Sequence, residues 1–99
     1  MLKSIIQKDN TRCFICGERE EKLDCHHVFN ASNRKKSEKY GLIVYLCHNK
    51  CHLYGVHQNA GMMQELKAKA QEIAMEYYGW SVDDFRKVFG KNYILYDEE

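Results

Sequence analysis

The chain has 99 residues, with 15 Lys or Arg against 14 Asp or Glu, five cysteines, five histidines and no proline. Its 44% hydrophobic and 29% charged residues exclude a disordered or low-complexity chain, and no apolar run approaches the ~20 residues of a membrane span. We therefore expect one soluble domain over residues 1–99, with a small core.

All the cysteines and histidines lie within residues 13–57. Residues 1–57 also hold ten Lys or Arg against six acids, whereas residues 58–99 hold five against eight. The first residues lack an apolar stretch long enough for a signal peptide, so we expect a cytoplasmic protein with reduced thiols. Closely spaced thiols in that compartment are more typical of metal ligands than of disulfides.

The first expected elements are a cysteine knuckle and two strands. Residues 13–17, Cys-Phe-Ile-Cys-Gly, predict a tight turn in which Gly17 supplies a positive φ. Residues 22–29 and 42–46 alternate or carry β-branched and aromatic side chains, which favours strands. The polar, basic residues 30–39 between them predict a loop.

Helices are expected in the rest of the chain. Residues 47–54 predict about two helical turns that end at Gly55. From about Asn59, a helix ending at Gly79 is predicted because apolar residues recur at intervals of four, four, three and four. These residues are Met62, Leu66, Ala70, Ile73 and Tyr77.

A second, shorter C-terminal helix is expected after Ser81. Ser81 and Asp84 fit a capping box, and Gly90 marks the helix end. Its expected apolar face consists of Phe85, Val88 and Phe89. Residues 93–96 predict an edge strand or a packed tail.

Four of the five cysteines form two pairs with metal-ligand spacing, Cys13-x2-Cys16 and Cys47-x3-Cys51. The thiols of the second pair are expected at i and i+4 on one helix face, where both reach a single ion. Four thiolates complete a closed tetrahedral site, which predicts structural zinc; buried free cysteines are the alternative. Cys25 has no spaced partner and is expected to be a packed residue or free thiol.

The adjacent pair His26 and His27 should have two different roles, because neighbouring side chains on a strand point to opposite faces. His52 directly follows the second cysteine pair and is expected to lie near His26, with an open-sided metal site between them. Histidine titrates near neutrality, which suits a general base. The pattern favours metal-assisted phosphodiester hydrolysis, with His26 as ligand and His27 as base; purely structural histidines are the alternative.

A family resemblance supports this interpretation. His26-His27-Val28, a strand ending in Leu46-Cys47, and Cys51-His52, all framed by an earlier CxxC, resemble the HNH (ββα-metal) endonucleases in their zinc-stabilised form. Residues 26–29, 33–42, 45–47 and 55–59 also look like the phage recombination-enhancement (Ref-type) family of RecA-dependent nucleases, a likeness that covers about residues 13–93.

The resemblance implies an α+β fold, with a zinc-stabilised ββα-metal (HNH) core at residues 13–59 and two C-terminal helices at residues 60–99. It implies a DNA endonuclease linked to phage recombination, in a bacterial or phage-infected host cytosol. His27 would be the general base, and His26 with a helix histidine would hold a catalytic divalent ion. We expect Mg²⁺ or Mn²⁺, with Zn²⁺ or Ni²⁺ as alternatives, and DNA and a RecA filament as partners.

Two positions depart from the family's pattern. The asparagine in the middle of the family's motif, which would orient the base, falls near Ile43 in this sequence. The candidates to replace it in that role are Asn30, Asn33 and Asn59. The position four residues after His52 is Val56, so we expect His57 to be the further metal ligand. His48 is the alternative, either for this ion or for the zinc.

The basic residues between the strands are expected to contact DNA phosphates, because they lie beside the predicted site. They are Arg34, Lys35, Lys36 and Lys39; an ordinary solvated surface is the alternative. Two other functions compete with the nuclease. One is a zinc-stabilised nucleic-acid-binding module without catalysis, and the other is a thiol redox or metal-sensing protein, although no thioredoxin-like βαβ pattern accompanies the CxxC.

Overall fold

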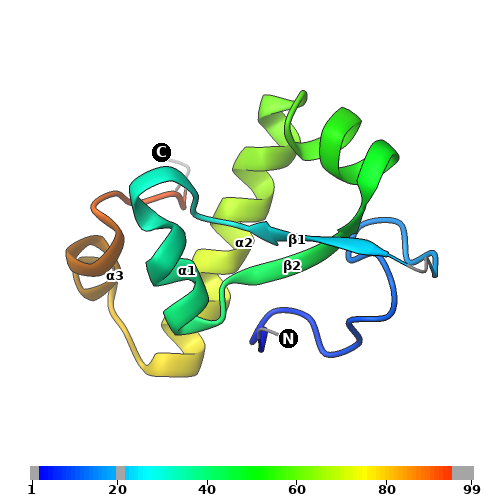
Figure 1. Cartoon of the computed structure of the whole chain (residues 1–99). Coiled ribbons are helices and arrows are strands. Elements are labelled where there is room, and N and C mark those ends of the chain that lie inside the picture. Colours follow the sequence, from blue (N-terminus) through cyan, green and yellow to red (C-terminus); the bar gives the residue numbers. More distant parts are fainter. Residues whose placement is uncertain (1–2, 20–21, 95–99) are drawn as a thin grey trace, which may run out of the picture.

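The computed structural model describes residues 3–19 and 22–94 and contains a two-stranded antiparallel sheet with helices around it (Figure 1). Helix α2 crosses behind the sheet, α1 and α3 lie at one end of it, and the π-helix η2 lies at the other. The predicted α+β class is confirmed. Within the described residues, no helix has the length and apolar character to cross a membrane. The elements in chain order are β1 (Leu23–His27), the 3₁₀-helix η1 (Ala31–Asn33), α1 (Arg34–Tyr40), β2 (Ile43–Cys47), η2 (His48–Val56), α2 (Ala60–Tyr78) and α3 (Val82–Phe89).

The two predicted strands are present and pair from Leu23 opposite Cys47 to His27 opposite Ile43. All five residues of β2 are buried, and the N-terminal segment covers the edge of β2 that β1 leaves open. The side-chain oxygen of Gln7 accepts from the Tyr45 N–H at 2.7 Å, and the Phe14 N–H donates to the Tyr45 carbonyl at 2.9 Å. The edge is thus protected from pairing with other chains, and the cysteine knuckle is attached to β2.

Helix α1 replaces most of the loop predicted for residues 30–39, so that expectation is wrong for residues 34–39. Arg, Lys and Glu are good helix formers, and Gly41 ends the helix in a left-handed conformation with φ of 73°. A Cβ at Gly41 would also lie 3.0 Å from the Ile5 side chain. The helix has no apolar stripe, since its buried residue is Ser37, which explains why the hydrophobic pattern did not predict it.

Ser37 ties α1 to the chain that follows β1. Its hydroxyl donates to the Phe29 carbonyl at 2.5 Å and accepts from the Phe29 N–H at 3.1 Å, and the side chain is fully buried. We expect Ser37→Ala to lower the free energy of unfolding by about 1–3 kcal/mol, because both backbone groups lose their partner in a buried place. Urea unfolding measures this change; exposed Ser32→Ala is the control, and equal stability of the two variants would contradict the assignment.

The two C-terminal helices are present with the predicted caps. The Asn59 side chain accepts from the Met62 N–H at the start of α2, Gly79 ends α2, and both hydrogen bonds of the Ser81 capping box are formed. The buried face of α2 differs from the prediction, because Tyr77 is 64% exposed. The buried residues of α2 are Leu66, Ala70, Gln71 and Ala74.

Gln71 explains this shift of the buried face. Its side-chain amide donates to the Asn92 side chain at 2.7 Å and accepts from the Tyr93 N–H at 2.7 Å, so a polar residue anchors the tail beneath α2. Tyr93 packs against Phe29 with ring centroids 4.9 Å apart. Residues 93 and 94 form no strand, in agreement with the packed tail, whereas residues 95 and 96 of that prediction lie outside the described residues.

Candidate functional site

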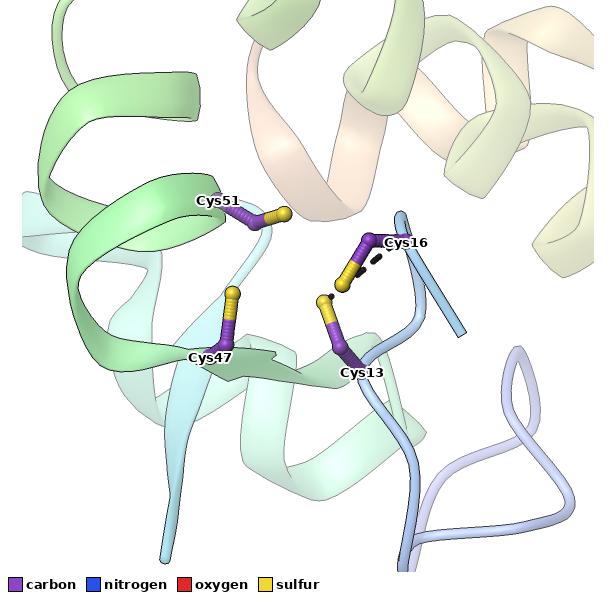
Figure 2. A group of neighbouring side chains, drawn as sticks. All are labelled: Cys13, Cys16, Cys47 and Cys51. Atoms are coloured by element: carbon purple, nitrogen blue, oxygen red, sulfur yellow. Dashed lines mark hydrogen bonds between the residues drawn. The ribbon is translucent and has the colours of Figure 1, made fainter. Parts of the chain in front are cut away.

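The four paired cysteines come together in one cluster (Figure 2). Their sulfur atoms all lie within 4.8 Å of one another, whereas a tetrahedral ion with Zn–S bonds of about 2.3 Å holds its sulfurs roughly 3.8 Å apart. A small inward movement closes the site, so the cluster can hold a structural metal ion. The cysteines involved are Cys13, Cys16, Cys47 and Cys51.

The second cysteine pair is arranged differently from the prediction. Cys47 is the last residue of β2 and the N-cap of η2, and only Cys51 lies within that helix. The pair therefore joins the end of a strand to the first turn of a helix, and does not lie on one helix face. On the other side, the knuckle has the predicted turn, since Gly17 has φ of 76° and its N–H donates to the Cys13 carbonyl at 2.9 Å.

The cysteine cluster favours one negative charge and resists a second. Burial raises the pKa of Cys13, but backbone N–H groups of Cys16, Cys47 and Ile15 outweigh it and lower the pKa to about 7. Burial together with the neighbouring thiols raises the pKa of Cys51 far above its usual range. Because a metal ion binds thiolates and neutralises their charge, a divalent cation resolves this conflict.

The segment after Cys47 forms a π-helix, which the sequence did not predict. Gly55 does not end it; the glycine is buried inside η2, where a Cβ would lie 3.1 Å from the Lys50 carbonyl oxygen. The His57 N–H donates to the His52 carbonyl at 3.2 Å, five residues back. This wider turn brings side chains five residues apart onto one side, so His52 and His57 converge.

Three histidines from β1 and η2 face one another. The ring centroid of His26 lies 5.3 Å from that of His52 and 5.4 Å from that of His57, and the Nε2 atoms of His52 and His57 are 3.0 Å apart. His26 is only 3% exposed, and its buried Nε2 has no hydrogen-bond partner among the described residues. An orphaned imidazole nitrogen is costly unless it binds something, and an ion among the three rings fits that requirement.

The charge state of His26 also suits a ligand. Burial, followed by the nearby histidines, lowers its pKa to about 4. The ring is therefore neutral at physiological pH and offers a lone pair. The structure brings the predicted grouping of His26, His52 and His57 together, with ligand atoms within 4.8 Å of one another.

Asp24, which was not predicted as a site residue, holds His52 in a defined tautomer. Its Oδ2 lies 2.8 Å from His52 Nδ1 and 2.7 Å from His48 Nδ1. Burial raises the pKa of Asp24, but the hydrogen bonds from His52 and His48 outweigh it and lower the pKa. An ionised carboxylate only accepts, so Nδ1–H of His52 donates and its Nε2 keeps the lone pair that faces His57.

His27 does not share the partners of His26 and instead contacts a carboxylate on α1. Its Nε2 lies 2.8 Å from Oε1 of Glu38 on α1, a partner that the sequence analysis also missed. Two of the three asparagines expected to orient the base have other partners: Asn33 donates to the Phe89 carbonyl and Asn59 caps α2. Asn30 lines the same pocket as His27.

An open pocket of about 410 Å³ unites the histidines. His26, His27, His52 and His57 line it, and Arg34 at the start of α1 contributes the positive charge. Cys25 and the chain at Asn30 and Ala31 complete the wall. Cys25 thus belongs to the wall of this pocket and not to the cysteine cluster.

The remaining predicted DNA contacts do not all face this pocket. The Lys36 ammonium donates to the Val88 carbonyl at 2.6 Å and so ties α1 to α3. The Lys39 ammonium lies 5.3 Å from the ring centroid of Tyr40. Lys35 is exposed. Arg34 is therefore the basic residue of α1 that the structure brings to the histidines.

The chain matches no protein-family model, no curated protein and no solved structure. The chemistry of the two centres must therefore follow from their own side chains. The cysteine cluster is a closed set of four donors, whereas the histidine group offers three donors beside an open, positively charged pocket.

Proposed function

We propose that the protein is a zinc-stabilised, metal-dependent DNA endonuclease with an HNH (ββα-metal) core. The observation that carries this proposal is the orphaned, buried Nε2 of His26, which faces His52 and His57 at the wall of an open pocket. Three imidazole nitrogen donors with open positions are typical of a catalytic ion, whereas four thiolates are typical of a structural one. The protein thus separates stability and catalysis between two metal centres.

Zinc is the ion we assign to the cysteine cluster. Thiolates are soft ligands, and an all-cysteine tetrahedron in a reducing compartment is a common structural zinc site. The zinc joins the knuckle to the junction of β2 and η2, since Cys47 and Cys51 lie on either side of that junction. It therefore sets the position of η2, which carries His52.

The catalytic ion would be one of the divalent ions expected from the sequence. Three imidazoles alone suit Zn²⁺ or Ni²⁺, whereas Mg²⁺ or Mn²⁺, which prefer oxygen ligands, would keep water in their remaining positions. When bound, the ion would stabilise the negative charge that develops on the scissile phosphate. His26, His52 and His57 would hold it through Nε2 atoms, and Asp24 keeps His52 in the required tautomer.

His27 acts as the general base in this proposal. Its Nε2–H donates to Glu38, so the lone pair resides on Nδ1. Nδ1 takes a proton from a water molecule, the water oxygen forms a bond to phosphorus, and the ester P–O bond breaks. The leaving oxygen then takes up a proton from solvent. Glu38 orients the imidazole and stabilises the positive charge that it gains.

Arg34 and the open pocket support a phosphodiester substrate. Arg34 lines the pocket beside the histidines, where a guanidinium suits a phosphate. The likeness to phage recombination-enhancement nucleases suggests DNA bound to a RecA filament as the natural target.

A nuclease assay tests this proposal. The intact protein is incubated with plasmid and with single-stranded DNA in Mg²⁺ or Mn²⁺, with and without RecA, and a parallel reaction contains EDTA. We expect cleavage that needs the divalent ion. DNA binding without cleavage under every condition would favour a zinc-stabilised nucleic-acid-binding module instead.

Substitution of Arg34 and Lys35 by alanine tests the DNA contact. We expect weaker binding for unrelated duplex sequences and a salt dependence of affinity that is flatter by up to ~0.9 per lost phosphate contact. Lys36 is left intact because it holds α1 to α3. Exposed Arg86→Ala/Lys87→Ala on α3 is the charge-matched control, and an unchanged salt slope in the α1 variant would assign Arg34 and Lys35 to ordinary surface.

A further inference from the structure

A third group of possible metal ligands lies on the other side of the His52 ring. Asp24, His48 and His52 offer atoms within 4.8 Å of one another. The Nδ1 atoms of both histidines point at the same oxygen, Asp24 Oδ2, at 2.7 and 2.8 Å. The nuclease proposal uses Asp24 and His52 but leaves His48 without a role.

We propose that Asp24, His48 and His52 form a second, exchangeable site for a divalent transition-metal ion such as Zn²⁺, and that it competes with the histidine pocket for His52. The metal binding stands on these three residues alone. The effect on DNA cleavage rests on the proposed function.

The donor set indicates the class of ion. Two imidazole nitrogens and one carboxylate oxygen are a common zinc ligand set, with the fourth position left to water. Such donors favour Zn²⁺, Ni²⁺ or Cu²⁺ over Mg²⁺, which prefers oxygen ligands and keeps its water. The His48 side chain is 60% exposed, so an ion can enter and leave directly from solvent.

The local backbone brings these donors together. Asp24 and His26 are two residues apart on β1, so their side chains share one face of the strand, and that face meets η2. His48 and His52 are four residues apart on η2 and both reach Asp24. The site is therefore built on a strand and a helix that the cysteine cluster already holds in place.

Competition follows from the chemistry of imidazole. A neutral ring has one lone pair and one N–H. In the histidine pocket, His52 offers Nε2 while Nδ1–H donates to Asp24. An ion bound at Nδ1 moves the proton to Nε2, which then faces His57 as a donor. One neutral His52 therefore serves one of the two sites at a time.

The binding test uses a variant in which the pocket is disabled. His26→Gln and His26→Gln/His48→Gln proteins are washed with EDTA, and retention of one zinc per chain verifies the folded cysteine site. Each is then titrated with Zn²⁺ by calorimetry. We expect one further zinc in His26→Gln and at least about tenfold weaker binding in the double variant. Equal binding by the two proteins, or no further zinc in His26→Gln, would overturn the proposed site.

The competition test uses DNA cleavage in Mn²⁺ with increasing Zn²⁺. His48→Gln leaves all three pocket histidines in place, so its rate without added Zn²⁺ should equal that of the wild type. We expect its inhibition to need at least about tenfold more Zn²⁺. Equal inhibition of both proteins would overturn the competition. Absence of cleavage by the wild type would refute the nuclease proposal, while the calorimetry would still decide the metal site.

Discussion

Cys51→Ser is expected to release the structural zinc and to unfold residues 13–57. Structural zinc contributes ~10–16 kcal/mol of apparent binding free energy that is coupled to folding, and a 99-residue chain has only a small core to replace it. Because Cys51 and His52 are neighbours on η2, the variant should also lose ion binding in the histidine pocket. Elemental analysis measures the loss of zinc, and circular dichroism measures the unfolding.

Cys25→Ser is the matched control for this prediction. Cys25 lines the histidine pocket and lies outside the cysteine cluster. The zinc content and the thermal unfolding of the Cys25→Ser protein should therefore stay close to those of the wild type. Folded wild-type protein that contains no zinc after mild purification would contradict the structural role. Thiol titration with and without a zinc chelator would then test a redox or metal-sensing function.

His27→Ala is expected to slow DNA cleavage by roughly 10²–10⁴-fold, the usual contribution of general acid–base catalysis. The protein should fold, keep its structural zinc and bind DNA, since His27 contacts Glu38 and is not part of the His26 group. His26→Ala should also abolish most cleavage, but through weaker binding of the catalytic ion. High Mn²⁺ should therefore restore part of the activity of His26→Ala and none of that of His27→Ala.

Single-turnover rates across a Mn²⁺ titration distinguish these two losses. The expected result is a rate that saturates at higher Mn²⁺ for His26→Ala, and a uniformly low rate for His27→Ala. The His48→Gln protein provides the control for loss of a nearby histidine. Cleavage by folded His27→Ala at the wild-type rate would remove His27 as the base.

Local sequence rules predicted the parts of the fold that depend on neighbouring residues. Asn59, Ser81 and Gly90 act at helix ends as expected, because caps need only a suitable side chain or a left-handed residue. The strands agree within about two residues at their ends. The knuckle at Gly17 was equally local.

The π-helix and α1 were not predictable in this way. Gly55, the next-to-last residue of η2, resembles a helix end in sequence, yet η2 continues through it to Val56, and a Cβ there would lie 3.1 Å from the Lys50 carbonyl oxygen. The wide turn then aligns His52 with His57, a spacing that an α-helical pattern does not favour. Helix α1 is short and is held in place by the hydrogen bond from the Ser37 hydroxyl to the Phe29 carbonyl. It has no hydrophobic repeat from which the sequence could have predicted it.

The two missed carboxylates differ in how they could have been found. Asp24 alternates onto the same strand face as His26, and a carboxylate there is a natural partner for a ligand histidine. Glu38 reaches His27 only because residues 34–40 are helical. Its role as the partner of His27 depends on the helical conformation of α1, and a loop prediction for these residues gave no reason to place Glu38 beside His27.

The most direct measurement of the central claim is anomalous X-ray diffraction from crystals of EDTA-washed protein soaked in Mn²⁺. We expect zinc among Cys13, Cys16, Cys47 and Cys51, and manganese bonded to the Nε2 atoms of His26, His52 and His57. Manganese that binds elsewhere, or a histidine pocket without manganese at concentrations that support DNA cleavage, would contradict the assignment of the catalytic ion to these three histidines.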